Sequence, residues 1–289
     1  MNLVSPVAGA WIREMRVKHW TKNVFVLSIM PYLLVPFNFQ KILDVGIMFV
    51  AFCCAASSIY LCNDLLDVEK DRKHPTKYRR PIAAGVISIR EALIAAIGLT
   101  ILSLVLSFKE GEKTLILVFL YLCITHSYSF WGKHIPFVDV SLVGILYGIR
   151  VLGGTFAADI KPSGMLYWVT LASLLALFIE LGKRYAEFRT VGPGETRKVL
   201  ASYSETKFSI FFAILAIAIL AIYLVATWQM VPWFSLSTIL VGPALYLFHR
   251  AIRKLEEDTH PLEVIMAEKW LCGIVVVFGV SFMTTIITR

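Results

Sequence analysis

Nine apolar stretches, each long enough to cross most of a bilayer, limit what this chain can fold into more than any other feature. They lie at residues 24–39, 45–62, 92–108, 115–131, 138–158, 164–181, 208–228, 233–248 and 270–287. A helix that crosses the hydrocarbon core needs about 20 mostly apolar residues. Of the 289 residues, 58% are hydrophobic and only 17% are charged, which is outside the range of soluble globular proteins. The sequence therefore predicts an all-α, polytopic integral membrane bundle of nine transmembrane helices, forming one domain over residues 1–289.

The positive charges predict how the bundle is oriented. If the N-terminus is inside, most of the 28 Lys and Arg residues fall on the internal side, in loops such as 70–90 and 183–207. This bias predicts a multi-pass protein of the inner cell membrane with a cytosolic N-terminus, an external C-terminus and its chemistry on the cytosolic face. Residues 1–22 are expected to form an interfacial segment. Retention by the membrane and attraction of anionic lipid or phosphate account for the net charge of +8, so no nucleic-acid partner is implied.

A run of acids follows directly on the second apolar stretch. Asn63 and Asp67 are four residues apart, as are Asp67 and Asp71, and Asp64 precedes Asp67 by three, so a continuing helix would place all four on one face. Three carboxylates on one stripe repel one another and need a positive partner. A hard divalent cation with oxygen ligands, bridging to a phosphate-bearing substrate, is such a partner. We therefore predict that these four residues bind Mg²⁺ and that the three aspartates are catalytic; the alternative is a solvated, acidic helix end.

The loop that follows the acids is basic and contains two prolines. Pro75 and Pro81 should end the helix and turn the chain, so that Lys77 and Arg80 fold back over the acidic stripe. A metal site covered by cations suits a polyanion such as a diphosphate. Ordinary enrichment of positive charge in cytosolic loops is the alternative explanation of these residues.

At this point the residues resemble a known family. The acid run, the K-x-R-R-P-I-A-A-G-like loop, the nine helices and residues 128–139 (Y-S-F-W-G-K-H-I-P-F-V-D) together resemble the UbiA superfamily of intramembrane prenyltransferases over nearly the whole chain. Three further motifs resemble its decaprenyl-phosphate phosphoribosyltransferase branch: Trp20-Thr21-Lys22-Asn23, His74-Pro75-Thr76-Lys77 with Arg80-Pro81-Ile82-Ala83, and Gly182-Lys183-Arg184-Tyr185-Ala186-Glu187. The resemblance implies a Mg²⁺-dependent enzyme that moves a 5-phosphoribosyl group from phosphoribosyl pyrophosphate to a polyprenyl phosphate.

This chain differs from many members of the superfamily at one motif, and that difference distinguishes the phosphoribosyltransferase branch from the aromatic prenyltransferases. Aromatic prenyltransferases of this fold carry a second aspartate-rich motif near the sixth span, where this chain has Lys183 and Arg184. A basic pair binds phosphate directly, so we expect a second phosphate site here; cations at the cytosolic end of a helix are the alternative. An aromatic prenyltransferase acting on a quinone or haem precursor and a lipid or phosphate transporter remain alternative functions.

The other candidate substrate-binding residues flank the spans or lie within one of them. They are Lys22, Tyr128, Lys133, Asp139, Arg150 and Glu187. Arg150 should lie about 16 Å along its helix, where it must pair with an acid or reach the substrate cavity. For the lipid phosphate, Lys18, Lys22 and Lys183 are the leading head-group contacts. Glycines 144, 148, 153 and 154 are interpreted as helix-packing positions. A homo-oligomer is left open by the sequence.

Overall fold

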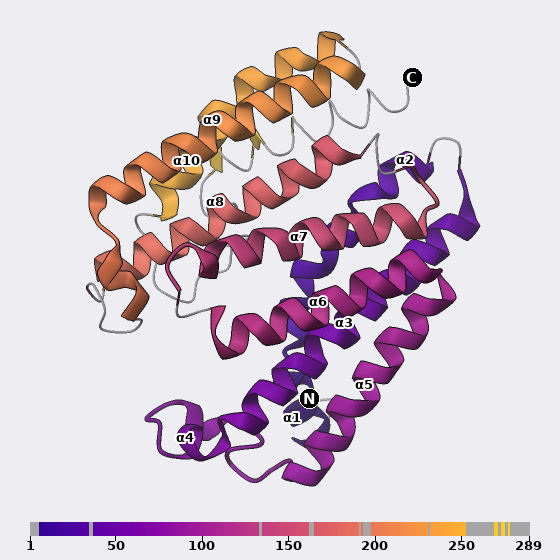
Figure 1. The fold of residues 1–289 in the computed structure, drawn as a ribbon, viewed down its shortest axis with the longest axis vertical. Helices are drawn as coiled ribbons and strands as arrows, with labels where there is room; N and C mark the ends of the chain where they lie inside the picture. The colour runs from indigo at the N-terminus through magenta and orange to yellow at the C-terminus, as the bar shows by residue number, and fades with distance from the viewer. Residues whose placement is uncertain are drawn as a thin grey trace. The chain divides into compact units, whose positions relative to one another are not determined.

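A computed structural model describes residues 6–34, 37–132, 135–161, 165–190, 192, 198–230, 232–252, 269–270, 273–274 and 277. Its α-helices are α1 (Pro6–Glu14), α2 (Met30–Leu34), α3 (Phe39–Leu66), α4 (Val68–Arg72), α5 (Ile89–Lys109), α6 (Glu112–Phe130), α7 (Val138–Ala157), α8 (Leu166–Thr190), α9 (Glu205–Met230) and α10 (Thr238–Ile252), as drawn in Figure 1. The 3₁₀ segments are η1 (Val17–Ile29), η2 (Lys77–Arg79), η5 (Lys198–Ser202) and η6 (Pro232–Ser237). Over the described residues, an isolated bridge between Leu34 and Phe37 is the only β pairing, which confirms the all-α class.

Six of the described helices are long and apolar enough to cross a membrane. These are α3, α5, α6, α7, α8 and α9, and they coincide with the second to seventh predicted stretches. The most apolar segment of α9 has a mean hydropathy of 2.9, yet only 22% of it is buried inside the protein. A helix that exposes so much apolar surface is suited to contact with lipid rather than water.

The predicted first and eighth spans are each formed by two shorter elements, and most of the predicted ninth span lies outside the described residues. In the first, η1 is followed by the short helix α2, whose second residue is Pro31. Proline has no N–H to donate into the preceding turn, so the chain starts a new helix there. The eighth is formed by η6 and α10. Most of residues 270–287 lies outside the described parts of the chain, so the total of nine spans stays a prediction.

The chain divides into two compact units. The first comprises Met1–Leu33, Asn38–Ser129 and Ile149–Lys161; the second comprises Leu34–Phe37, Phe130–Gly148 and Pro162–Arg289. Within the first unit, α3 packs along α5 and against η1 (Figure 1). Within the second unit, α8 and α9 pack together, and α10 contacts both of them.

A small apolar core in the first unit holds the loop between α4 and α5 against the end of α3. Leu61, Val68, Ile82 and Ile87 are buried in it, and Ala10 of α1 joins them. The Ser88 hydroxyl then accepts a hydrogen bond from the Glu91 amide and forms a complete capping box at the start of α5. The polar residues between α4 and α5 are therefore anchored by buried neighbours on both sides.

The glycines of α7 allow close helix contact, as their spacing predicted. A Cβ at Gly144, Gly148 or Gly153 would lie 2.5 or 2.6 Å from a neighbouring side-chain atom. A Cβ at Gly154 would collide with the backbone carbonyl oxygen of Val26 in η1. The packing interpretation of these glycines is therefore confirmed.

Candidate functional site

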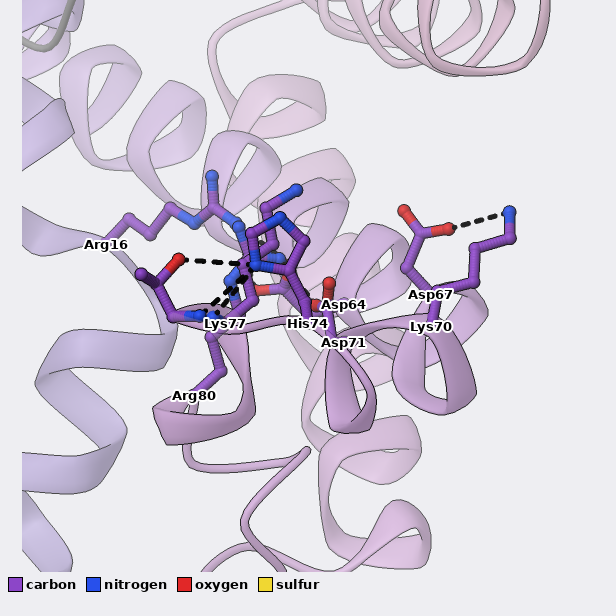
Figure 2. A network of polar contacts seen from close by, with 9 residues as sticks. Arg16, Asp64, Asp67, Lys70, Asp71, His74, Lys77 and Arg80 are labelled. Carbon is purple, nitrogen blue, oxygen red and sulfur yellow. Dashed lines mark hydrogen bonds and ion pairs between the residues drawn. The ribbon is translucent and has the colours of Figure 1, made fainter. Parts of the chain in front are cut away.

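Asp64 and Asp71 converge on one guanidinium group in the first unit. Arg80 Nη1 donates to Asp64 Oδ1 and to Asp71 Oδ2, at 2.7 Å in each case (Figure 2). Both carboxylates are buried, with side chains 5% exposed, and Arg80 is partly exposed. The loop thus folds back over the acids, as its two prolines predicted, and Arg80 supplies the positive charge that the two carboxylates need.

A second arginine, Arg16, which was not predicted from the sequence, completes this cluster. Arg16 Nη2 donates to both Asp64 oxygens, at 2.9 and 3.1 Å. Its guanidinium carbon also lies 4.6 Å from the centroid of the Tyr60 ring, within the range of a cation–π interaction. The Arg16 backbone is left-handed, with φ of 49°, a conformation that costs a non-glycine residue about 1 kcal/mol or more. The surrounding contacts therefore hold Arg16 in an unfavourable conformation that directs its side chain to Asp64.

Asp67 lies apart from the other two aspartates. Its Oδ1 is 3.3 Å from Lys70 Nζ and its side chain is 42% exposed, and Figure 2 shows the pair pointing away from Asp64 and Asp71. The helix α3 ends at Leu66, and Asp67 adopts φ of −96° and ψ of 4° as the chain turns into α4. This turn is why the expected single stripe of acids is formed by Asp64 and Asp71 alone. Asn63 is half-buried one residue before Asp64.

The oxygen donors of this cluster fit a divalent cation. Asp64 and Asp71 present oxygens to the same nitrogen, so the two carboxylates lie close enough to share one positive ion. Carboxylate oxygen is the ligand that Mg²⁺ prefers in proteins. Among the described residues, no group of three or more His, Cys, Asp or Glu side chains is already gathered around one point. The arrangement is a pair of buried carboxylates whose charge is balanced by Arg16 and Arg80.

Glu14, the last residue of α1, also faces Asp64 and was not anticipated. Its side chain is 2% exposed, and its Oε1 has no hydrogen-bond partner. Burial and the neighbouring Asp64 carboxylate raise the pKa of Glu14 to about 7, against the opposing effect of Arg16 and Arg80. Glu14 lies in a short stretch of basic and apolar residues, whose pattern does not indicate that this acid is buried beside Asp64.

The loop itself is held by His74. Its Nδ1 accepts hydrogen bonds from the backbone amides of Thr76 and Lys77, at 3.3 and 3.4 Å. These contacts close the turn that precedes Arg80. The Lys77 side chain is exposed, so it is available to a ligand that approaches from solvent.

The second unit holds a separate buried ionic network centred on Arg184. Its guanidinium donates to Asp139 Oδ2 at 3.1 Å, to Glu180 Oε1 at 2.8 Å and to Glu187 Oε2 at 3.4 Å. Asp139 is fully buried, and Arg184 and Glu187 are nearly so. The sequence predicted that basic residues replace the acids of this region. In addition, α7 and α8 surround Arg184 with three carboxylates, which were not predicted as its partners.

Neighbouring groups extend this network. Phe137 donates its amide to the Tyr203 hydroxyl at 3.1 Å, and that hydroxyl lies 3.5 Å from Asp139 Oδ1. Burial raises the pKa of Tyr203 to about 12, so this phenol stays protonated at neutral pH. Lys183 Nζ lies 3.7 Å from Glu180 Oε2, and its side chain is 30% exposed. Lys183 is thus more accessible to a ligand than Arg184.

Arg150 is buried in the first unit and contacts polar groups from two other elements. Its Nε donates to Asn23 Oδ1 at 2.8 Å, and its Nη2 donates to the Tyr121 hydroxyl at 3.0 Å. The same guanidinium lies 4.8 Å from the Tyr121 ring centroid. Asn23 in turn donates to Cys53 Sγ at 3.3 Å. This helical arginine is thus stabilised by an amide and a phenol, partners that the sequence did not identify.

The remaining predicted residues are scattered over the described chain. Lys22 in η1 and Tyr128 in α6 are half-buried, and Lys18 is exposed. Lys133 lies outside the described residues. The structure therefore gathers Asp64, Asp71 and Arg80 in the first unit, and Asp139, Arg184 and Glu187 in the second.

Several curated proteins are similar to this chain over most of its length. It is 36% identical over 280 residues to the decaprenyl-phosphate phosphoribosyltransferase of Corynebacterium glutamicum. This similarity covers 92% of this chain and 83% of that protein. It is 35% identical over 219 residues to the enzyme of the same name from Mycobacterium tuberculosis, covering 74% of this chain and 72% of the relative.

Solved structures share the fold at lower identity. A digeranylgeranylglyceryl phosphate synthase matches with a TM-score of 0.70 at 20% identity, covering 99% of this chain and all of that one. A UbiA homolog from Archaeoglobus fulgidus bound to GPP and Mg²⁺ matches with a TM-score of 0.65 at 16% identity, covering 96% and 99%. The sequence model of the UbiA prenyltransferase family matches residues 24–265. With its long apolar helices, this chain is a multi-pass membrane protein that belongs, as its motifs predicted, to the UbiA prenyltransferase family.

Proposed function

We propose that this protein transfers a 5-phosphoribosyl group from phosphoribosyl pyrophosphate to a polyprenyl phosphate of the decaprenyl type. Two relatives named decaprenyl-phosphate phosphoribosyltransferase, 35% and 36% identical to it, support this activity. The structural observation that carries the proposal is the convergence of Asp64 and Asp71 on Arg80. Two carboxylates beside the long basic side chains of arginine and lysine are suited to bind a diphosphate together with its metal ion.

Each residue of this cluster has a proposed role. Asn63, Asp64, Asp67 and Asp71 would hold Mg²⁺, which supplies charge neutralisation for a departing diphosphate when it is bound. Arg80, which donates to Asp64 and Asp71, would donate to diphosphate oxygens if these carboxylates held the cation instead. Lys77, exposed on the same loop, adds a second positive charge. Solved UbiA homologs bound to Mg²⁺ or Cd²⁺ support the use of a divalent metal in this family.

The reaction needs charge stabilisation more than a base. The bond between the anomeric carbon and the diphosphate oxygen breaks, and a bond from that carbon to an oxygen of the lipid phosphate forms. The transition state is expected to resemble an oxocarbenium ion, with negative charge growing on the departing diphosphate. Because the acceptor is already an anion at neutral pH, no side chain has to remove a strongly held proton.

The second unit offers features that suit the lipid acceptor. An open apolar pocket of about 200 Å³ is lined by side chains of α7, α8 and α9 and by Phe137: Phe137, Val140, Ser141, Leu177, Leu181, Phe211, Ile214 and Leu215. Lys183 follows Leu181 by two residues on α8. A polyprenyl chain could occupy the pocket while its phosphate binds Lys183. Lys18 and Lys22, which belong to the first unit, stay predicted phosphate contacts. The other predicted residues keep their proposed part in substrate binding, directly or through neighbours. They are Tyr128, Lys133, Asp139, Arg150, Arg184 and Glu187.

The proposed topology follows from the concentration of Lys and Arg residues in the loops predicted to be cytosolic. The N-terminus would face the cytosol and the C-terminus the outside of the inner membrane, so the acidic cluster would meet a soluble donor from the cytosolic side. The partners are therefore phosphoribosyl pyrophosphate, a polyprenyl phosphate and membrane lipid. A homo-oligomer is compatible with this function but is not required by it.

A substrate-choice assay tests the proposal. Purified protein in lipid vesicles with Mg²⁺ would receive phosphoribosyl pyrophosphate with decaprenyl phosphate, and separately a prenyl diphosphate with 4-hydroxybenzoate. We expect a phosphoribosylated lipid from the first pair and no prenylated acid from the second, identified by mass. Prenylation of the aromatic acid without consumption of phosphoribosyl pyrophosphate would instead assign the chain to the aromatic prenyltransferases.

A further inference from the structure

The apolar pocket of the second unit lies toward the ends of α7, α8 and α9 that the predicted topology places on the cytosolic side. Its lining residues fall within the ranges 137–141, 177–181 and 211–215. Ile214 is 55% exposed and Phe137 is 37% exposed, so the pocket is open rather than enclosed. At this level of a bilayer, a lipid has its charged head group beside water and its chain in the apolar interior.

A hydrogen bond joins the wall of this pocket to the buried ionic network. The Phe137 amide donates to the Tyr203 hydroxyl at 3.1 Å, and that hydroxyl donates to Asp139 Oδ1 at 3.5 Å. Asp139 in turn accepts from Arg184. Tyr203 lies between η5 and α9, and it is only 5% exposed. Its hydroxyl therefore acts as acceptor and donor at once, between an apolar wall and a charged group.

Phe137 is held in a backbone conformation that it would not adopt alone. Its φ is 66°, in the left-handed region, which costs a bulky residue about 1 kcal/mol or more. Its ring packs on those of Tyr203 and Phe211, with centroids 5.0 and 4.7 Å apart. Since Tyr203 contacts both the ring and the amide of Phe137, it is a main constraint on where this wall of the pocket stands.

The change from apolar to charged surroundings occurs within a few residues. Phe137 lies two residues before Asp139 and Val140 one residue after it, and both line the pocket. An alkyl group that displaced Asp139 or Arg184 would leave a buried charge without its partner. A lipid chain in the pocket must therefore end at Phe137, and the part of the chain nearest its polar head group would lie there.

We propose that the isoprene unit next to the phosphate of the lipid acceptor packs against Phe137, and that Tyr203 is the positioning residue that holds Phe137 in place. This inference rests on the proposed function, which supplies the polyprenyl phosphate. An acceptor with an apolar chain and an anionic head group suits the site, because Lys183 follows the pocket residue Leu181 by two positions on α8.

Removing one hydroxyl from each of two tyrosines tests the positioning role. Tyr203→Phe keeps the ring, which stacks on Phe208 with centroids 4.9 Å apart, but leaves the Phe137 amide without its acceptor. Tyr223→Phe is the matched control, because Tyr223 is also buried, has its hydroxyl 2.6 Å from Ser237 Oγ and does not line the pocket. In vesicles, Tyr203→Phe should raise the KM for decaprenyl phosphate about fivefold or more and leave the KM for phosphoribosyl pyrophosphate unchanged. Tyr223→Phe should change neither.

Photolabelling tests the contact at Phe137 without relying on turnover. The probe is a decaprenyl phosphate analogue that carries a diazirine in the isoprene unit next to the phosphate. After irradiation in vesicles, mass spectrometry of the digested protein should find the label on the segments that contain Phe137 or Phe211, and excess decaprenyl phosphate should remove it. Tyr203→Phe should reduce this labelling, and Tyr223→Phe should not. Label confined to segments outside the pocket would overturn the proposal.

The outcomes separate this inference from the proposed function. If the wild type makes no phosphoribosylated lipid but is labelled at Phe137, the proposed function fails and the contact of a lipid phosphate with Phe137 stands. If transfer proceeds and Tyr203→Phe changes both KM values equally, or changes neither, Tyr203 does not position the acceptor and the inference is rejected. A rise in the KM for decaprenyl phosphate alone, together with competed label at Phe137, supports it.

Discussion

Asp64→Asn and Asp71→Asn should each reduce phosphoribosyl transfer by about a hundredfold or more, because each removes a carboxylate that we propose as a Mg²⁺ ligand. Asp64→Asn should also destabilise the protein, since Arg16 and Arg80 both donate to this carboxylate. The loss of a buried, charge-assisted hydrogen-bond acceptor costs about 1–3 kcal/mol. Initial rates in vesicles, measured beside thermal unfolding, separate the two effects.

Asp67→Asn is the variant that separates catalysis from folding in this cluster. Asp67 is 42% exposed and pairs with Lys70, which is 84% exposed. Such surface pairs contribute about 0–1 kcal/mol, so the unfolding temperature should hardly change. If the whole motif binds the metal, transfer should still fall sharply. Full activity of Asp67→Asn would restrict the site to Asp64 and Asp71, whereas full activity of Asp64→Asn would contradict the site itself.

Arg184→Leu should lower the free energy of unfolding by about 3–5 kcal/mol, as expected when one partner of a buried ion pair is removed. Asp139, Glu180 and Glu187 all accept hydrogen bonds from this one guanidinium. Without it, three carboxylates in the second unit lose a common partner. Lys183→Leu is the matched control, because Lys183 is partly exposed and makes a longer contact of 3.7 Å.

The measurement is the midpoint of thermal or denaturant unfolding in detergent. Arg184→Leu should be much less stable than Lys183→Leu, and adding Asp139→Asn should recover part of the loss. If both single variants were equally stable, the network around Arg184 would not hold the second unit together. Because of this stability effect, the phosphate role predicted for the basic pair is better tested with Lys183→Ala, which should lower transfer about tenfold in a folded protein.

Most of the helices were predictable because each depends on local sequence. The apolar stretches that became α3 and α5 to α9 contain enough consecutive hydrophobic residues to define a helix of spanning length. The fold-back of Arg80 was also predictable, since Pro75 and Pro81 end the helix and turn the chain. The glycine spacing in α7 likewise predicted close contacts, such as that of Gly154 with Val26.

Other features depend on contacts between residues far apart in the chain. Arg16 meets Asp64 across 48 residues, and Arg184 meets Asp139 across 45. No local pattern reports such contacts. The left-handed backbone at Arg16, which ends the helical path at α1 and starts η1, is not typical of arginine and gave no signal in the sequence.

The acidic partners of Arg184 were not predicted as such from the sequence. Glu180 and Glu187 each lie three or four residues from Lys183 and Arg184, but only the basic pair was interpreted as a phosphate site. In the structure Glu180 and Glu187 lie one turn on either side of Arg184, so both reach its guanidinium, and Asp139 approaches from α7. The i,i+3 and i,i+4 spacing of these glutamates was the available signal.

The most direct test of the account is to measure lipid product and released diphosphate in one reaction. Wild-type protein in vesicles would receive decaprenyl phosphate and phosphoribosyl pyrophosphate, with Mg²⁺ or with excess EDTA, beside Asp64→Asn. The account predicts equal amounts of phosphoribosylated lipid and diphosphate with Mg²⁺, and almost none with EDTA or in the variant. Undiminished lipid product in EDTA, or in Asp64→Asn, would contradict it.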